Sequence, residues 1–250
     1  MQKSKYITIS IILLIFVYIL TSQMYFMSLG NIYTFIINPL FFMSLALFLK
    51  FFIIPPYSTN KYKKSIIQFV LITILLYSII YLLSGLLVGY GHNPYSSTFR
   101  GIIINLYATG LIVFCKEYIR YKLLNNVYNK DKKIIFVFIV IVFSLLNFNI
   151  ISIIKNYSFY YLFKQIFYAL LPSLLKNILF SYITLYTDHI PSFIYEIIYF
   201  SILWLSPILP DAPWVIESIL NCIFPLILLL YCRYFIHKKD RFHLNSISKP

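Results

Sequence analysis

Apolar residues run along this chain in long stretches, not in the alternating or one-sided patterns of soluble strands and helices. A helix crosses the bilayer core of about 30 Å with about 20 apolar residues. Eight windows are long enough, at residues 6–28, 33–54, 65–90, 101–120, 134–154, 166–188, 192–209 and 215–236. The pattern therefore predicts an all-α, polytopic membrane bundle of about eight transmembrane helices.

Composition supports the membrane class and excludes soluble folds. Hydrophobic residues make up 61% of the 250 residues and charged residues only 11%, whereas soluble domains carry about 25% charged residues. We predict one transmembrane domain over residues 1–240 and a short polar cytoplasmic tail over residues 241–250. The first window is long and is followed by further spans, which favours a retained signal anchor over a cleaved signal peptide.

The net charge of +14 is informative because of where the basic residues lie along the chain. Lys and Arg accumulate in short loops on the cytoplasmic side of membranes. If eight spans place both termini in the cytoplasm, all but four of the 21 Lys and Arg residues fall at cytoplasmic ends; the exceptions are Arg100, Lys155, Lys164 and Lys176. We therefore expect membrane lipids as partners and no nucleic acid. Enrichment in Phe, Tyr, Ile, Lys and Asn is typical of a low-GC genome, so we expect the cell membrane of a low-GC Gram-positive bacterium as the location.

Ionisable residues inside the predicted spans are few, and they indicate buried pairs or functional sites. Glu117 and Arg120 lie three residues apart on one helix face and can simply pair with each other. Glu196 is placed at a similar depth on another span, with Asp188 and His189 shortly before it. If these helices converge, the two carboxylates and a nearby His could activate a water molecule or bind a cation.

The predicted helix that contains Glu117 and Arg120 also carries a resemblance to a known family. Glu117 and Arg120, followed on the next span by Phe143-Ser144-Leu145-Leu146-Asn147, resemble the motifs of the CAAX-processing and bacteriocin-processing intramembrane proteases. That family has a double Glu with an Arg four residues later, and then a His; here Lys116 precedes Glu117, the Arg follows after three residues and Asn147 replaces the His. The resemblance implies Glu117, Arg120, Glu196 and Asn147 as catalytic residues.

Two loops on the predicted outer side form a second candidate site. The first is Gly89-Tyr90-Gly91-His92-Asn93-Pro94-Tyr95-Ser96-Ser97-Thr98, and the second is Ser206-Pro207-Ile208-Leu209-Pro210-Asp211-Ala212-Pro213-Trp214. Their Gly and Pro residues are typical of tight turns, and Trp214 suits an interfacial anchor. If the loops meet, we expect the binding residues His92, Asn93, Asp211, Trp214 and Glu217 to act there.

Together with the segment Lys116-Glu117-x-x-Arg120-Tyr121, these loops resemble the multi-span amino-terminal region of some large signal peptidase I-type proteins of Gram-positive bacteria. The resemblance implies a non-catalytic membrane module, without the catalytic domain, that serves a membrane-bound peptidase or peptide substrate. Two alternatives stay open: the intramembrane peptidase described above, and a lipid or solute carrier. A carrier would use Asn147, Pro172, Lys176 and Asn177, which interrupt the fifth and sixth windows.

No bound cofactor or metal is expected. The three cysteines fall inside apolar stretches without a CxxC pair, so we interpret them as packing residues; they are Cys115, Cys222 and Cys232.

Overall fold

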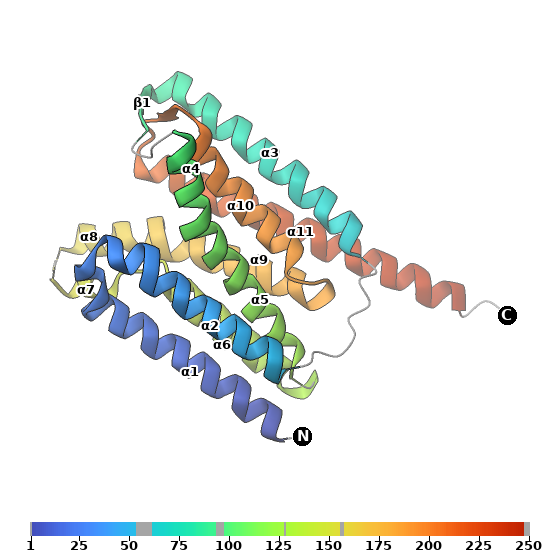
Figure 1. Ribbon diagram of the computed structural model, residues 1–250. Coiled ribbons are helices and arrows are strands. Elements are labelled where there is room, and N and C mark those ends of the chain that lie inside the picture. The colour runs from blue at the N-terminus through green and yellow to red at the C-terminus, as the bar shows by residue number, and fades with distance from the viewer. Residues whose placement is uncertain (1, 54–61, 94–97, 128, 156–157, 248–250) are drawn as a thin grey trace.

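The computed structural model is a bundle of helices (Figure 1). It describes residues 2–53, 62–93, 98–127, 129–155 and 158–247. In these residues the longer helices are α1 (Gln2–Met24), α2 (Asn38–Phe52), α3 (Lys63–Val88), α5 (Leu111–Asn125), α6 (Asn129–Leu145), α9 (Leu171–Tyr186), α10 (Ile190–Leu205) and α11 (Trp214–Ile247). Shorter helices are α4 (Phe99–Asn105), α7 (Ile150–Lys155), α8 (Phe159–Gln165) and a 3-10 helix at Phe26–Leu29. The all-α class is confirmed.

Six helical stretches within the described residues are long and apolar enough to cross a membrane: Lys5–Met24, Tyr33–Phe52, Lys63–Val88, Phe99–Asn125, Phe159–Tyr186 and Trp214–Lys238. Each overlaps one of the eight predicted windows. The other two windows hold shorter helices, because window 134–154 is divided between α6 and α7, and α10 has only 16 residues. A helix of that length measures about 24 Å. The chain is therefore a multi-pass membrane protein by the length and hydropathy of its helices.

Three of the long stretches contain a π-helical turn. The turn Tyr33–Ile37 leads into α2, Leu106–Gly110 joins α4 to α5, and Ile166–Leu170 joins α8 to α9. Pro172, which we expected to interrupt the sixth window, stands in the first turn of α9 directly after such a turn. A proline is tolerated in a first turn because the N–H that it lacks would have no intrahelical partner in a helix starting there. The run Phe159–Tyr186 stays helical throughout.

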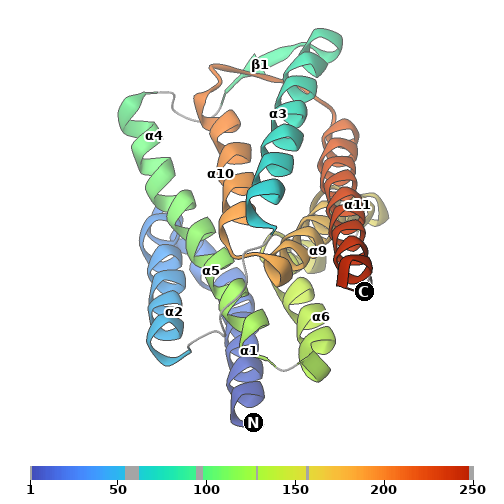
Figure 2. The same ribbon diagram turned by 90° about the vertical axis from the view of Figure 1, so that its right-hand side faces the viewer.

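The apolar core is divided into two parts. Buried residues of α1, α2, α5 and α6 form one cluster, and buried residues of α3, α9, α10 and α11 form the other. Figure 2 shows α1, α2 and α5 on one side of the bundle and α3, α10 and α11 on the other. The two parts meet where α9 packs against α5 and α6, and where α10 packs against α5.

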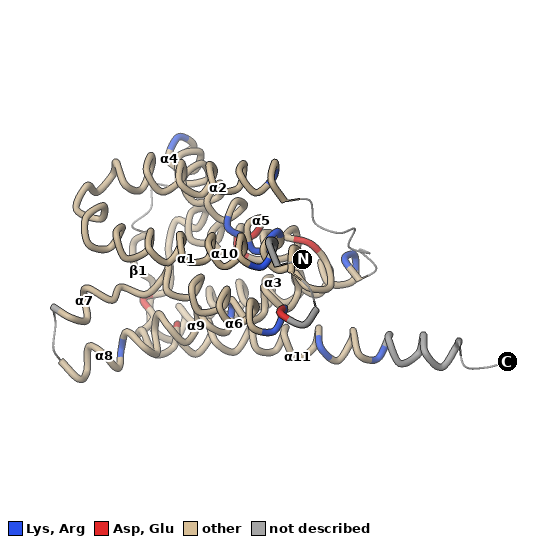
Figure 3. The backbone as a smooth tube through the Cα atoms, turned by 90° about the horizontal axis from the view of Figure 1, so that it is seen from below, with Lys and Arg blue, Asp and Glu red and all other residues tan. Residues whose placement is uncertain are grey.

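The two ends of the bundle differ in charge and in secondary structure. Lys and Arg lie mostly towards the end that carries both termini (Figure 3). At the opposite end, strand β1 (Tyr90–His92) pairs antiparallel with β2 (Ile208–Pro210), with Gly91 opposite Leu209. Gly89 allows the sharp exit from α3 into β1, because its φ of 92° lies in the region that side chains disfavour. The ribbon joins the two predicted outer loops.

Candidate functional site: a buried polar cluster

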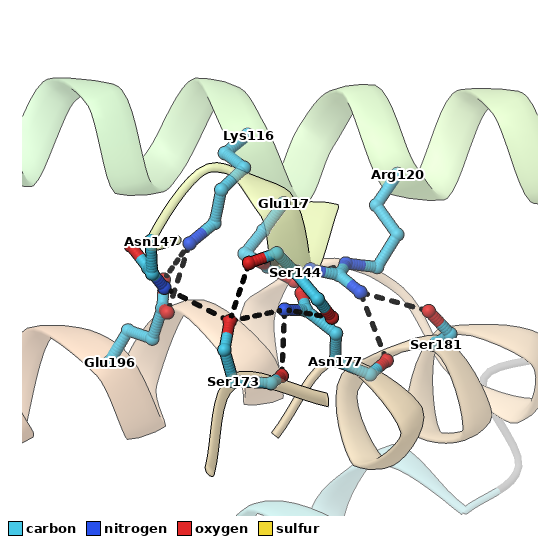
Figure 4. Close-up of polar contacts among 9 residues, drawn as sticks. All are labelled: Lys116, Glu117, Arg120, Ser144, Asn147, Ser173, Asn177, Ser181 and Glu196. Atoms are coloured by element: carbon cyan, nitrogen blue, oxygen red, sulfur yellow. Dashed lines mark hydrogen bonds and ion pairs between the residues drawn. The ribbon is translucent and has the colours of Figure 1, made fainter. Parts of the chain in front are cut away.

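Polar side chains from four elements turn toward one another where the two apolar cores meet (Figure 4). They come from α5, α6 with the residues just after it, α9 and α10. We call this group the buried polar cluster, and its members are Lys116, Glu117, Arg120, Ser144, Asn147, Ser173, Asn177, Ser181 and Glu196. Because unpaired polar groups are costly in a lipid environment, the contacts among them decide what the cluster can do.

Arg120 makes several of the contacts in the cluster and is fully buried, with 0% of its side chain exposed. Its Nε lies 3.0 Å from Glu117 Oε2, and its Nη2 donates to Glu117 Oε1 at 3.1 Å. Its Nη1 donates to Ser181 Oγ at 2.8 Å, and its Nη2 also donates to Asn177 Oδ1 at 2.5 Å. The guanidinium therefore holds the Glu117 carboxylate in a two-pronged ion pair and ties α5 to α9.

Asn177 extends this network to α6. Its Nδ2 donates to the Ser173 carbonyl oxygen at 2.8 Å and to Ser144 Oγ at 3.3 Å. Asn147 follows α6 and donates from its Nδ2 to Ser173 Oγ at 3.2 Å. The side-chain amides of both asparagines are thus engaged in contacts that hold α6 against α9.

Glu196 pairs with Lys116, not with Arg120. The Lys116 Nζ lies 2.9 Å from Glu196 Oε1 and 2.8 Å from Oε2, and only 5% of the Glu196 side chain is exposed. Consecutive residues on α5 thus engage different partners, because Lys116 reaches α10 while Glu117 pairs with Arg120 of its own helix. The ion pair Lys116–Glu196 crosses between the two apolar cores.

Positive charge exceeds negative charge around the cluster. Lys116 and Arg120 each face one carboxylate, and Lys176 brings a third cation. Among the described residues, Lys176 forms no ion pair within 4.0 Å; its Nζ lies 4.2 Å from the centre of the Tyr199 ring. A cation over an aromatic face is stabilised by the ring electrons, which partly compensates for its removal from water.

The predicted inner site residues are brought together in part. Glu117, Arg120, Glu196 and Asn147 all belong to the buried polar cluster. Asp188 and His189, which we expected beside the carboxylates, have other contacts: Asp188 Oδ2 pairs with Lys63 Nζ at 2.5 Å. The His189 ring centre lies 5.3 to 5.7 Å from the ring centres of Phe114, Tyr118 and Tyr121.

The imidazole of His189 gives a pH prediction. Burial lowers its pKa below the usual value of about 6.5, and Lys63 and Lys122 act in the same direction while Asp188 opposes them. Below pH 6.5 the unfolded chain then binds a proton more readily than the folded protein, so stability falls as pH drops. We expect a lower melting temperature in detergent at pH 5.5 than at pH 7.5, and a smaller difference in His189→Asn. An equal difference in both proteins would contradict this assignment.

The two outer loops meet through the β1–β2 ribbon. The Asp211 N–H donates to the Gly89 carbonyl oxygen at 3.0 Å beside the ribbon. The side chains of His92 and Asp211 are exposed, whereas Asn93 is buried. Pro94 to Ser97 lie outside the described residues. The loops thus come together as the second candidate site requires, and a binding role for its residues stays a prediction.

Three of the predicted outer residues have structural partners. Asn93 donates from its Nδ2 to the carbonyl oxygens of Leu203 at 2.7 Å and Ser206 at 2.5 Å, at the end of α10. Trp214 Nε1 donates to the Tyr160 hydroxyl at 3.3 Å. Glu217 Oε2 accepts from the Tyr168 hydroxyl at 2.9 Å. The last two contacts fasten the start of α11 to the segment that leads into α9.

Asn93→Ala should loosen the outer end of α10. The last carbonyls of a helix lack intrahelical partners, and here the Asn93 amide supplies them. We expect a loss of about 1–3 kcal/mol in unfolding free energy, measured as a lower melting temperature in detergent. His92→Ala, a change at the exposed neighbour, is the matched control and should leave the melting temperature unchanged. Equal melting temperatures for all three proteins would show that the Asn93 contacts contribute nothing.

Sequence reasoning missed most of the hydrogen-bonding partners. Lys116 was considered only as part of family motifs and not as a partner of Glu196, and Ser144, Ser173 and Ser181 were not selected as site residues. One signal was present, because Ser173, Asn177 and Ser181 recur every four residues in an apolar segment and so share one helix face. Such a stripe in a membrane helix indicates a face turned toward protein.

Comparison with protein-family models, curated proteins and solved structures finds no significant match to this chain.

Proposed function

We propose that this chain is a non-catalytic membrane module associated with protein processing, which holds a signal peptidase-type partner at its outer face. In this proposal it spans the bacterial cell membrane eight times, with α6 and α10 as the two shorter spans and both termini in the cytoplasm. The observation that carries the proposal is the pairing of both candidate catalytic carboxylates with cations inside the buried polar cluster.

The ion pairs argue against hydrolysis at this site. A general base must reach the attacking water molecule, whereas both candidate acids are buried and engaged by a neighbouring cation. Glu117 is held by Arg120, and Glu196 by Lys116. The same contacts link α5 to α9 and α10, which is what a scaffold requires.

The outer ribbon supports the docking role. It is short and is tied to α10 and α3 by hydrogen bonds. Asn93 donates to a carbonyl oxygen at the end of α10, and the Asp211 N–H donates to the carbonyl oxygen of Gly89 at the end of α3. His92 and Asp211 stay exposed beside it. A peptidase that acts on secreted chains would stand on this side of the membrane.

The partner can be tested by photo-crosslinking in cells. A photo-reactive amino acid in place of His92 should crosslink to a membrane-bound peptidase, identified by mass spectrometry. The control places the same group at Phe138, which is exposed on α6 and faces lipid in this arrangement. Crosslinks to lipid alone at both positions would refute the docking role.

Orientation needs a separate measurement. In a variant lacking the three cysteines, a single cysteine at Ala212 should react with a membrane-impermeant maleimide in intact cells, and one at Asn126 should react only after lysis. The reverse pattern would invert the proposed topology, and labelling of both in intact cells would reject the eight-span arrangement.

A second candidate, an intramembrane peptidase, is favoured by one observation. Glu117 on α5 and Glu196 on α10 lie in one buried cluster although 79 residues separate them in the sequence. If either acid cleaves peptides, Glu117→Gln should trap an uncleaved membrane substrate while its own abundance stays normal. A substrate trapped by this variant, together with an absent peptidase crosslink at His92, would replace the docking proposal with this one.

A further inference from the structure

One face of α10 is polar from the end near α9 to the middle of the bundle. His189, Ser192, Glu196 and Tyr199 are spaced by three, four and three residues, so their side chains share a face. Neighbours on such a face are about 5–6 Å apart at Cβ. The rest of α10 is largely apolar. A proton moving along this helix would therefore meet the lowest desolvation cost on the polar stripe.

The stripe continues toward the outer end through tyrosines of other helices. The Tyr199 side chain is hydrogen-bonded to those of Tyr77 and Asn221. The Tyr77 hydroxyl donates to Asn221 Oδ1 at 3.0 Å. Asn221 lies one turn of α11 from Glu217, which accepts from the Tyr168 hydroxyl at 2.9 Å. Hydroxyls and amides thus lead from the middle of the bundle to a carboxylate near the outer ribbon.

Glu196 stands at the centre of this line. The groups that act on it are Lys116, Glu117 and Arg120 from α5, Lys176 from α9, and Tyr195 and Tyr199 on its own helix. The Lys176 ammonium lies over the Tyr199 ring and interacts electrostatically with Glu196. The ammonium groups of Lys116 and Lys176 therefore both act on the Glu196 carboxylate.

The inner half of the stripe holds polar atoms without partners. Ser192 is 0% exposed, and its Oγ has no hydrogen-bond partner among the described residues; the same holds for the buried Nδ1 of His189. Unsatisfied buried hydroxyls are rare in native proteins because each costs the full loss of its hydration. These two atoms lie between Glu196 and the end of the bundle where the termini lie, which is where a transferred proton would leave.

We propose that the polar face of α10 is a proton path across the membrane, with Glu196 as the group that binds the proton midway. A proton bound at Glu217 passes through a bridging water molecule to the hydroxyl of Tyr199, which interacts with Glu217 and gives up one O–H proton as it gains another. The Glu196 carboxylate accepts it. The proton then passes by way of Ser192 to the Nδ1 of His189, whose Nε2 releases one to the inner solution.

Each step breaks one O–H or N–H bond and forms another, so the net change is one proton moved from the outer to the inner side. Spacings of one helix turn between carriers are short enough for one water molecule to bridge them. This inference rests on the proposed membrane arrangement, in which α10 is a span, but not on the proposed docking at the outer ribbon.

The test uses the purified full chain in phosphatidylcholine and phosphatidylglycerol vesicles that contain a pH-sensitive dye. A potassium gradient with valinomycin drives proton entry. We expect entry at least tenfold faster than in protein-free vesicles, and a fall to within twofold of that background for Glu196→Gln. Tyr199→Phe, which keeps the ring under Lys176 but removes the hydroxyl, should reduce the rate at least fivefold.

Matched controls make the same chemical changes away from the path. Tyr6→Phe alters an exposed tyrosine on α1, and Asp131→Asn neutralises a surface carboxylate paired with Lys5; both should keep the wild-type rate. If Glu196→Gln fails to fold, Tyr199→Phe and Ser192→Ala decide the matter. Wild-type entry no faster than protein-free vesicles, or unchanged rates in Tyr199→Phe and Ser192→Ala, would overturn the proposal.

Discussion

Arg120→Ala should produce the largest loss of stability of any single truncation in this protein. It removes the cation that pairs directly with Glu117 and leaves that carboxylate fully buried. Asn177 and Ser181 lose their guanidinium partner at the same time. Breaking a buried ion pair by removing one member costs about 3–5 kcal/mol, since the remaining charge stays desolvated. For a chain of this size the melting temperature should fall by on the order of 10 °C.

The measurement is the melting temperature of purified protein in mild detergent, followed by loss of the monodisperse peak in size-exclusion chromatography. Adding Glu117→Gln to Arg120→Ala should recover part of the loss, because the neutral amide removes the buried charge. Lys5→Ala breaks the partly exposed pair Lys5–Asp131 and should cost less than about 1 kcal/mol. Arg120→Ala with a melting temperature as high as that of Lys5→Ala would show that the pair contributes little.

Lys116→Glu should destabilise the protein on a similar scale, and a second change should reverse most of the effect. The substitution places three carboxylates, at positions 116, 117 and 196, in one buried cluster. Like charges at such distances oppose each other strongly where water is scarce. Adding Glu196→Lys exchanges the two charges of the pair and restores an attraction between α5 and α10.

We expect the single variant to accumulate poorly in membranes and the exchanged double variant to regain more than half of the wild-type level. Recovery in the double variant reports on the pair, because the exchange restores the attraction between positions 116 and 196 while the altered contacts with Lys176 and Glu117 remain. If the double variant accumulates no more than the less abundant of the single variants Lys116→Glu and Glu196→Lys, the two residues do not pair in the folded protein.

The parts of the fold that depend on residues close together in the sequence were predictable. Apolar runs of bilayer length predicted each of the six helical stretches that, within the described part of the chain, are long and apolar enough to cross a membrane. The spacing of Glu117 and Arg120 indicated their pairing, and the structure confirms that ion pair. The end of helix α10 was harder to predict. The helix ends at Leu205, before Ser206-Pro207, and the residues that follow form β2.

The remaining contacts of the site depend on tertiary packing that a single sequence does not reveal. Lys116 and Glu196 come together only because α5 and α10 pack across the two cores. Turn residues predicted both outer loops, yet their pairing as β1 and β2 requires that α3 and α10 end at the same level. Asn93 was predicted as a binding residue, and its hydrogen bonds to the end of α10 were not foreseen.

The division of the core into two parts constrains the order in which the chain can be assembled. Helix α3 belongs to the core that also contains α9, α10 and α11, whereas α5 and α6, which are made between them, pack with α1 and α2. At a synthesis rate of roughly 5–20 residues per second, α3 must wait in the lipid for several seconds before its first partner emerges. Its buried tyrosines Tyr77 and Tyr81 are exposed to lipid during that interval. A ribosome pause before α9 would therefore prolong the stage at which an insertase or a membrane protease can recognise the unfinished chain.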